Sequence, residues 1–425
     1  MRKWYLSLHA ITQGPMNGHL TGTRVPQQWA EVVLIGFILL LAPSCTSADP
    51  QDDGHTSALK TDDAGVVENI TVVQLRGEAW RVAETPELVI GAVEGDPKYQ
   101  FFRVAGATRL PNGGIAVANA GTSDVRIFDQ HGRYVVGTKG DGDGPGEFRA
   151  LRQFWPYRGD SLIAWDLRHR RATILGPDGR VGRQFQVDAA RANAKMLRPF
   201  SDGSFLLQNE PIEFSGSGVT EQTLELTLHG EDGTLRGFLG TFPAFTTITI
   251  RTGASPFIGS PRFSPTTSVA VSDSLVYIGR ARTPEIEVRD RYGKFVRWIR
   301  WPDSDRTVAA RDVRASKTAE LEAFDDDEVR RQRRAIQDKI PSAKQFPAFG
   351  RILADRVGRL WVERFRRPGD PDGRRWMVID GEGRTHRELT TPARFNPMEI
   401  GRDYILGVTR DELGVESIRM YRIEM

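Results

Sequence analysis

The sequence predicts an all-β fold, a six-bladed β-propeller, on the basis of three observations. Glycine is abundant, with 43 residues among 425, and no long periodic helix dominates the chain, which favours many short strands joined by turns. Residues 88–154 describe a unit of short strands and glycine-rich turns and then begin to repeat it after about 45 residues, a period typical of propeller blades. The same unit recurs along the rest of the chain.

Two strands of this unit recur six times, each beside a turn. The strand after the first turn is expected at residues 115–118, 162–165, 205–207, 275–278, 360–362 and 404–408. The strand that follows it is expected at residues 125–128, 172–175, 224–228, 286–288, 376–379 and 418–423. Five of the latter lead into turns that contain Gly132, Gly179, Gly233, Gly293 and Gly383. Glycine suits these turns because they need a residue with positive φ.

The fourth strand of the unit recurs only five times, at residues 134–136, 181–185, 238–239, 295–299 and 386–389. The sequence ends at Met425, directly after the sixth third strand. Leu88–Ile90 precedes the first unit and has the composition of a fourth strand. We therefore expect this N-terminal strand to close the ring and to remove the open edge of the sheet array.

A helical insertion is expected before the fifth blade, because the spacing of the turn glycines lengthens there from 60 to 90 residues. Asp325, with Glu328 three residues later, resembles a capping box at the start of an Arg-rich helix over residues 329–339. The acidic start and basic end of this helix complement its dipole, which indicates a solvated face; a lid or a partner-docking helix is the alternative. Ile336 and Ile340 are expected to pack on the propeller.

An uninterrupted apolar run of 11 residues occupies positions 32–42. A membrane-spanning helix needs about 20 apolar residues, whereas the hydrophobic region of an export signal needs about 7 to 15. We therefore expect an export signal, with translation starting at Met1 or Met16. Cys45 is the only cysteine and follows this run; it resembles the lipidated cysteine of a bacterial lipoprotein, and an incidental thiol near a cleavage site is the alternative.

Three parts are expected along the chain. Residues 1–45 form the export signal, and residues 46–67 form a flexible tether, because their polar, Asp-rich composition cannot offset the entropy lost on ordering. Residues 68–425 form the propeller, with the helical insertion at residues 303–344.

Residues 116–135 (AVANAGTSDVRIFDQHGRYV) resemble an NHL repeat. The linker at residues 140–148 (GDGDGPGEF) looks like the signature of bacterial NHL-like six-bladed β-propeller lipoproteins. The resemblance extends over residues 74–425 and implies the fold. It implies no single activity, because propellers of this kind include binding scaffolds, lactonase-like hydrolases and lyases.

The charge and the histidines limit the function classes. The 58 Lys and Arg residues nearly balance the 55 Asp and Glu residues, without a long basic run, which argues against nucleic-acid binding. A lactonase-type metal needs Glu, Asp, Asn or His side chains that converge on the channel. The seven histidines do not cluster, and Glu399 and Asp355, the plausible carboxylates near inner strands, belong to no recognisable ligand set. We therefore expect no metal and no cofactor.

An arginine lies in or just before the inner strand of every expected blade. The set comprises Arg103, Arg149, Arg152, Arg198, Arg262, Arg351 and Arg394. Inward-pointing members would form a positive funnel that attracts carboxylate or phosphate groups, although strand alternation must send some of them between blades. Arg152 and Arg351 are the first candidates, because they lie within the inner strands. Trp155 either reaches a channel mouth or packs between blades.

The expected function is that of a non-catalytic binding module, exported and held at the cell envelope by a lipid on Cys45, facing the periplasm or the exterior. Its expected partner is a small anionic ligand or an envelope protein. The alternative is a lactonase-like hydrolase or a lyase with a metal site in the channel. Convergent acidic and histidine ligands in the channel would discriminate the two.

Overall fold

The structure is a computed structural model that describes residues 57–61, 67–75, 78–188, 190–213, 216–252 and 255–425. Cys45, the expected export signal and most of the expected tether lie outside the described residues. Among the described residues, no helix is long and apolar enough to cross a membrane.

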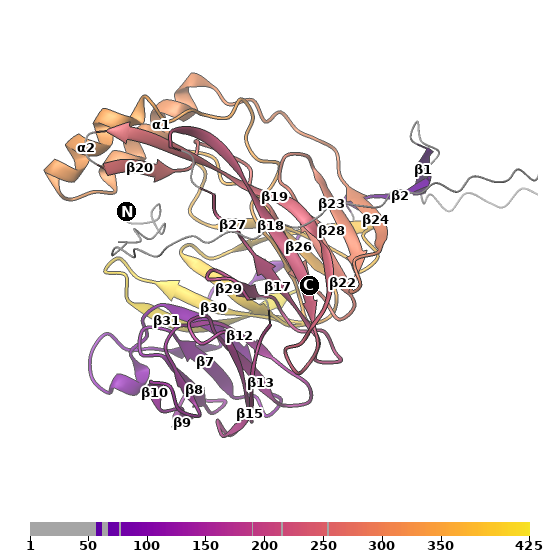
Figure 1. Ribbon diagram of the computed structural model, residues 1–425, viewed down its shortest axis with the longest axis vertical. Helices are drawn as coiled ribbons and strands as arrows, with labels where there is room; N and C mark the ends of the chain where they lie inside the picture. The colour runs from indigo at the N-terminus through magenta and orange to yellow at the C-terminus, as the bar shows by residue number, and fades with distance from the viewer. Residues whose placement is uncertain (1–56, 62–66, 76–77, 189, 214–215, 253–254) are drawn as a thin grey trace, which may run out of the picture. The chain divides into compact units, whose positions relative to one another are not determined.

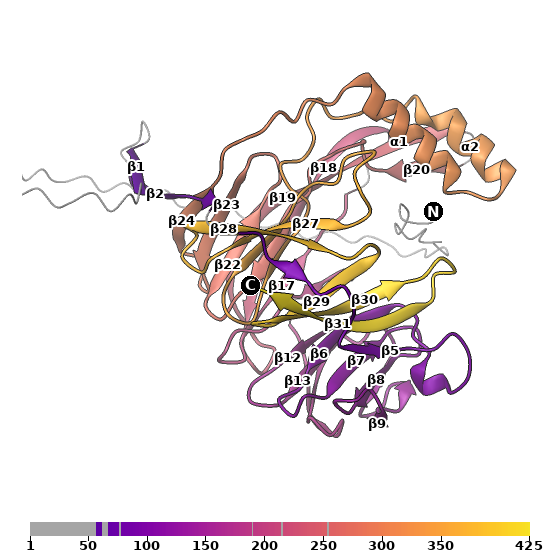
Figure 2. The ribbon, with the colours of Figure 1, turned by 180° about the vertical axis from the view of Figure 1, so that it is seen from behind.

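Six antiparallel sheets follow one another along the chain (Figures 1 and 2). Sheet one contains β6 (Val104–Arg109), β7 (Ile115–Asn119), β8 (Asp124–Phe128) and β9 (Tyr134–Gly137). Sheet two contains β12 (Leu151–Pro156), β13 (Leu162–Asp166), β14 (Arg171–Leu175) and β15 (Val181–Gln186). Sheet three contains β16 (Lys195–Met196), β17 (Phe205–Asn209), β18 (Gly218–His229), β19 (Leu235–Thr252) and β20 (Ser255–Gly259).

Sheets four to six have the same meander. Sheet four contains β21 (Ser268–Val271), β22 (Leu275–Gly279), β23 (Glu285–Asp290) and β24 (Phe295–Arg300). Sheet five contains β25 (Ile352–Ala354), β26 (Leu360–Glu363), β27 (Arg374–Ile379) and β28 (Thr385–Thr391). Sheet six contains β29 (Phe395–Ile400), β30 (Tyr404–Arg410) and β31 (Glu416–Glu424). A 3₁₀ helix (Pro97–Tyr99) precedes sheet one, and a parallel pair, β10 (Gly140–Asp141) and β11 (Glu147–Phe148), lies in the linker to sheet two.

The fourth strand of sheet six comes from the N-terminal side of the chain. β5 (Leu88–Ile90) pairs antiparallel with β31, so that Ile90 lies opposite Ile418 and Leu88 lies opposite Met420. Leu88 and Ile90 are buried while Val89 is exposed, as expected for a strand with one face in a core. The predicted closing strand is confirmed.

The sheets form a closed ring, because each sheet shares a buried apolar core with the next one and sheet six shares a core with sheet one. Each of the six larger clusters of buried apolar side chains combines residues from two neighbouring sheets. One of them joins sheet six to sheet one and contains Ile90, Phe128 and Ile418. Strands such as β7 are buried along their whole length because a sheet in the ring packs on both faces. The all-β propeller fold predicted from the sequence is therefore confirmed.

The turns between the third and fourth strands explain the recurring glycines. All five glycines predicted for these turns have a positive φ, between 75° and 87°. In sheet one, the Asp129 carboxylate accepts hydrogen bonds from the N–H groups of His131 and Arg133 around Gly132. A Cβ at Gly132 would also lie 3.2 Å from the side chains of Leu88 and Ile90. Glycine is thus needed both for the turn and for the closing strand beside it.

An N-terminal belt (residues 67–75 and 78–87) runs along the outer strands of three sheets before β5. Its strand β2 (Val67–Val72) pairs parallel with β24, and β3 (Gln74–Leu75) pairs parallel with β28. Its last strand, β4 (Arg81–Val82), pairs antiparallel with β31. A further strand, β1 (Ser57–Thr61), pairs antiparallel with β2. The structure therefore has strand where the sequence suggested only tether, because edge backbone groups of the ring and of β2 supply hydrogen-bond partners.

The largest departure from the regular repeat is an extension of sheet three together with the insertion before sheet five. The fourth strand expected at residues 238–239 is part of the 18-residue strand β19. The insertion contains two helices, α1 (Ala310–Glu322) and α2 (Asp327–Gln337). Asp326, not Asp325, is the N-cap of α2, and its carboxylate accepts hydrogen bonds from the N–H groups of Glu328 and Val329.

The helices pack on the extended strands of sheet three. Ile340 shares a small buried cluster with Ile248 and Ile250 of β19, and both views show α1 and α2 beside β20 and the end of β18 and β19 (Figures 1 and 2). Ile336 and Ile340 are buried, as expected. The packing surface of Ile340 is the extension of sheet three, which the sequence did not predict.

Candidate functional site

Three arginines from alternate sheets converge at the end of the ring where the first and second strands of each sheet are joined, which we call the first-turn end. Arg109 ends β6 in sheet one, Arg198 precedes β17 in sheet three, and Arg356 follows β25 in sheet five. Equivalent hydrogen bonds close the first turns of these sheets, from Leu110 N to Gly114 O, Phe200 N to Ser204 O and Asp355 N to Arg359 O. The arginines lie within two residues of these bonds, which places them at the same level of the ring.

A buried carboxylate, Glu399 of β29, lies between these arginines. Its Oε1 accepts hydrogen bonds from the backbone N–H of Arg109 at 3.0 Å and from the Tyr404 hydroxyl at 2.7 Å. Its Oε2 lies 2.7 Å from Arg356 Nη2 and accepts a hydrogen bond from the Thr108 hydroxyl. Each oxygen of the Glu399 carboxylate therefore has two donors, and the carboxylate links sheets one, five and six.

Two of the arginines reach past a neighbouring sheet. Arg356 of sheet five donates from Nη2 to Thr108 Oγ1 at 2.8 Å and to the carbonyl oxygen of Arg109 at 3.1 Å, both in sheet one. Arg198 of sheet three donates from Nη1 to the carbonyl oxygen of Asp355 in sheet five at 3.0 Å. Because each contact skips one sheet, these side chains cross the space that the inner strands enclose.

The donors of these arginines are incompletely used. Arg356 Nε is buried and has no hydrogen-bond partner among the described residues. Arg198 uses only Nη1 for a hydrogen bond within this part of the chain, and its Nη2 lies 3.8 Å from the Asp273 carboxylate. The Arg109 guanidinium lies 5.1 Å from the centroid of the Tyr404 ring, a cation–π contact that leaves its N–H edges open to an acceptor.

The charges at the first-turn end favour a negatively charged ligand. Burial lowers the pKa of Arg198, and the charge of Arg356 lowers it further, while the charges of Asp273, Glu399 and Asp355 oppose the shift. Burial and the Glu399 charge raise the pKa of Tyr404 well above its ordinary value, so its hydroxyl stays protonated as a donor. The Asp355 carboxylate is engaged by Arg359 and by Trp361 Nε1. The Arg198 and Arg356 guanidinium groups thus lie among the carboxylates of Glu399, Asp273 and Asp355, of which Asp355 is paired with Arg359.

Of the arginines that the sequence singled out, only Arg198 belongs to this group. Arg103 and Arg394 precede inner strands with left-handed φ values of 58° and 59°. Arg103 is exposed, and Arg394 lies 3.5 Å from the Glu412 carboxylate. Arg152 is exposed in β12 without a hydrogen bond or ion pair to the described residues. These residues are not brought together.

The remaining sequence candidates have structural partners. Arg149 pairs with Asp141 and Asp143 of the linker between sheets one and two. Arg262 is buried and donates to the carbonyl oxygens of Gln337 and Ile340, each at 2.9 Å, so that it holds the helical insertion.

Two further candidates pack within or between sheets. Arg351 Nε donates to the Glu363 carboxylate at 3.0 Å, and its guanidinium lies 5.4 Å from the centroid of the Trp376 ring. Trp155 Nε1 donates to the carbonyl oxygen of Met196, and its ring packs in the core between sheets two and three. Trp155, which the sequence singled out as a channel residue, thus packs against the core between two sheets.

Sequence reasoning missed Arg109, Arg356, Thr108 and Tyr404. It did note Glu399 and Asp355 as carboxylates near inner strands, and an arginine one residue after Asp355 was a usable signal. No group of three His, Cys, Asp or Glu side chains within the described ranges is placed to hold a metal ion.

Comparisons with known proteins find only remote similarity. No family model matches the chain, and no curated protein matches it. A member of the DUF4221 family from Bacteroides vulgatus is 11% identical with a TM-score of 0.46, covering 82% of this chain and 99% of that one. A gluconolactonase from Xanthomonas campestris is 10% identical with a TM-score of 0.38, covering 80% and 99%. A streptogramin B lyase is 10% identical with a TM-score of 0.36, covering 79% and 96%. Similarities this remote carry no argument about activity.

Proposed function

We propose that this protein is an exported, non-catalytic binding module that takes a small anionic ligand at the first-turn end of its ring. The observation that carries the proposal is that the Arg198 and Arg356 side chains meet at one end of the ring, beside the Tyr404 ring on which the Arg109 guanidinium lies. The Glu399 carboxylate at this place already has its hydrogen bonds made. A ligand carboxylate or phosphate would supply acceptors for the open donors of these arginines. Charge-assisted bonds of this kind are stronger than neutral ones, and guanidinium groups suit planar, bidentate recognition.

The wider setting of the proposal follows from the sequence. We propose that residues 1–45 act as an export signal, that Cys45 carries a lipid anchor, and that part of residues 46–67 serves as a tether to the envelope. We also propose that the six sheets are the complete set of blades of an NHL-like propeller. A hydrolase or lyase of lactonase type would need a channel ligand set, and Glu399 is instead surrounded by hydrogen-bond donors. This arrangement supports binding.

Calorimetry with citrate and with inorganic phosphate tests the anion site. The perturbation is the double substitution Arg109→Gln, Arg198→Gln, which removes two charges without touching the Arg356 contacts that join sheets five and one. Losing a charged hydrogen bond costs about 1.5–3 kcal/mol, so we expect at least a roughly tenfold increase in Kd. Binding should also weaken between about 20 mM and about 150 mM salt, because screening increases over that range.

Arg152→Gln is the matched control, because it removes an exposed arginine that has no partner among the described residues. The control should bind both probes like the wild type. An unchanged Kd in the double variant, or an equal loss in the control, would show that the arginine convergence does not bind anions.

The lipid anchor has a separate test. Mass spectrometry of the mature protein should find a lipid-modified N-terminus at Cys45. An unmodified N-terminus at another residue would remove the anchor from the proposal and leave the anion site untouched.

A further inference from the structure

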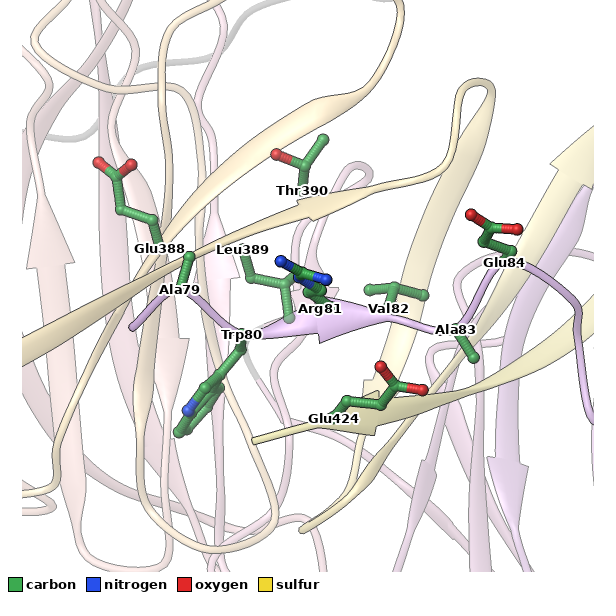
Figure 3. Close-up of a pocket in the computed structure, with 10 residues that line it drawn as sticks. All are labelled: Ala79, Trp80, Arg81, Val82, Ala83, Glu84, Glu388, Leu389, Thr390 and Glu424. Atoms are coloured by element: carbon green, nitrogen blue, oxygen red, sulfur yellow. The ribbon is translucent and has the colours of Figure 1, made fainter. Parts of the chain in front are cut away.

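A pocket of about 560 Å³, which shares no lining residue with the arginine site, lies between the belt strand β4 and the outer strand β28 of sheet five. Its wall includes Trp80, Arg81 and Val82 of the belt, Leu389 and Thr390 of β28, and Glu424 at the end of β31. Figure 3 shows the Arg81 and Leu389 side chains between the two strands, with Glu84 and Glu424 toward the end of β4. This volume is in the range of small-molecule and peptide-side-chain sites.

The pocket exists because the belt changes sheets here. Trp80 N donates to the carbonyl oxygen of Glu388 in sheet five at 2.9 Å, whereas Ala83 N donates to the carbonyl oxygen of Arg422 in sheet six at 2.9 Å. Between these two bonds the chain leaves the edge of β28 and joins β31. The edge of β28 beyond Glu388 therefore has no hydrogen-bonded partner strand among the described residues, because β4 turns away from it toward β31.

Backbone groups from two strands face this gap. In a strand, successive residues direct their N–H and C=O groups to opposite sides. Glu388 bonds outward to Trp80, so Thr390, two residues later, also faces outward. Ala83 bonds to β31, so Val82 directs its backbone groups away from β31 and toward β28. Neither Val82 nor Thr390 has a backbone partner on this side in the described part of the chain.

The charged residues that line the pocket are three glutamates and one arginine. Glu84 and Glu424 are exposed and have no ion pair with a described residue, and Glu388 is paired with Arg364. Arg81 is the one cation among the lining residues that the structure describes, and it has no hydrogen-bonded acceptor there. Leu389 and Val82 provide an apolar floor, since Leu389 belongs to the core between sheets five and six and Val82 packs against that core.

We propose that this pocket binds an extended peptide segment with basic side chains, which adds as a strand beside β28 and β4. Val82 and Thr390 supply the main-chain hydrogen bonds that hold an added strand. Glu84 and Glu424 select lysine or arginine side chains, and the apolar floor accepts the alternate, uncharged side chains of the segment. An exposed edge of this kind is a template for pairing with another chain.

Fluorescence anisotropy on the full chain tests the proposal with a labelled Lys-Val-Lys-Val-Lys peptide. Two matched probes separate its parts: Glu-Val-Glu-Val-Glu reverses the charge, and the lysine peptide N-methylated at both valines removes two main-chain donors. We expect only the unmethylated lysine peptide to bind. The double substitution Glu84→Gln, Glu424→Gln should weaken the binding of this peptide about three- to tenfold, the effect of losing two exposed charge pairs.

The control variant is Glu382→Gln, an exposed glutamate in the turn before β28 that is paired with Arg384, and it should bind the lysine peptide normally. Arg109→Gln, Arg198→Gln should also leave peptide binding unchanged, which separates this site from the anion site. Equal binding of the methylated or acidic peptide, or no effect of the Glu84 and Glu424 changes, would overturn the proposal. So would self-association of the protein in sedimentation without peptide binding, which would identify a second copy as the occupant.

Discussion

The closing strand β5 provides the sharpest test of the fold. Its side chains alternate, with Ile90 at 1% exposure and Val89 at 50%. Ile90 lies opposite Ile418 and belongs to the core that joins sheet six to sheet one. The substitution Ile90→Ala therefore removes buried methyl groups from the one place where the two ends of the ring meet.

The size of the effect follows from this burial. Truncating a buried isoleucine to alanine costs about 2–5 kcal/mol, because the transfer free energy is lost and a cavity remains. A domain is stable by only about 5–15 kcal/mol, so Ile90→Ala should remove a large share of the free energy of unfolding. Val89→Ala changes an exposed side chain in the same strand and should stay within about 0.5 kcal/mol of the wild type.

Urea denaturation followed by tryptophan fluorescence measures both variants. We expect Ile90→Ala to unfold at clearly lower urea than Val89→Ala, and deletion of Leu88–Ile90 to give unfolded or oligomeric protein because it reopens a sheet edge. Equal unfolding midpoints for the two alanine variants would refute the reasoning, since the ring would then be stable without the closing core.

Three other predictions follow from local contacts. Burial lowers the pKa of His229, so the histidine is neutral in the folded protein and the unfolded chain binds one more proton at low pH. The free energy of unfolding should therefore fall as the pH drops below about 6.5. His229→Gln should flatten this pH dependence in melting curves. Asp326→Ala removes the N-cap of α2 and should cost about 1 kcal/mol of local stability, seen as faster hydrogen exchange in α2 but not in β7. Arg262→Ala leaves the Gln337 and Ile340 carbonyl oxygens without their buried donor and should make the helical insertion sensitive to limited proteolysis, whereas Arg311→Ala on the exposed face of α1 should not.

The fold could be predicted because its signals are local and repeated. The turn glycines Gly132 and Gly383 mark positions where any other residue would be strained, and the apolar runs before them mark strands buried on both faces. The closing strand was predictable by elimination, since five fourth strands were found for six units. The helix α1 was not, because its N-cap is Ala309, which offers no side-chain cap, and none of its side chains is fully buried.

The candidate site could be predicted only in part. Arginines near inner strands were visible, but their directions were not, and Arg152 and Arg262 occupy quite different environments although both were candidates. The backbone N–H of Arg109 contacts Glu399 across 290 positions of the chain, and this contact exists only when the ring has closed. The same holds for Arg356, which lies in a turn and gains its role by reaching past sheet six.

The sequence by itself determined that this protein is an all-β propeller with an N-terminal closing strand and one helical insertion, because strand period, turn chemistry and apolar runs act over short distances. Only the tertiary structure decided which arginines converge, where the belt leaves the edge of β28, and that the helices rest on an extension of sheet three. These features depend on the closed ring, in which residues far apart in the chain become neighbours and a change of one position along a strand reverses the direction of a side chain.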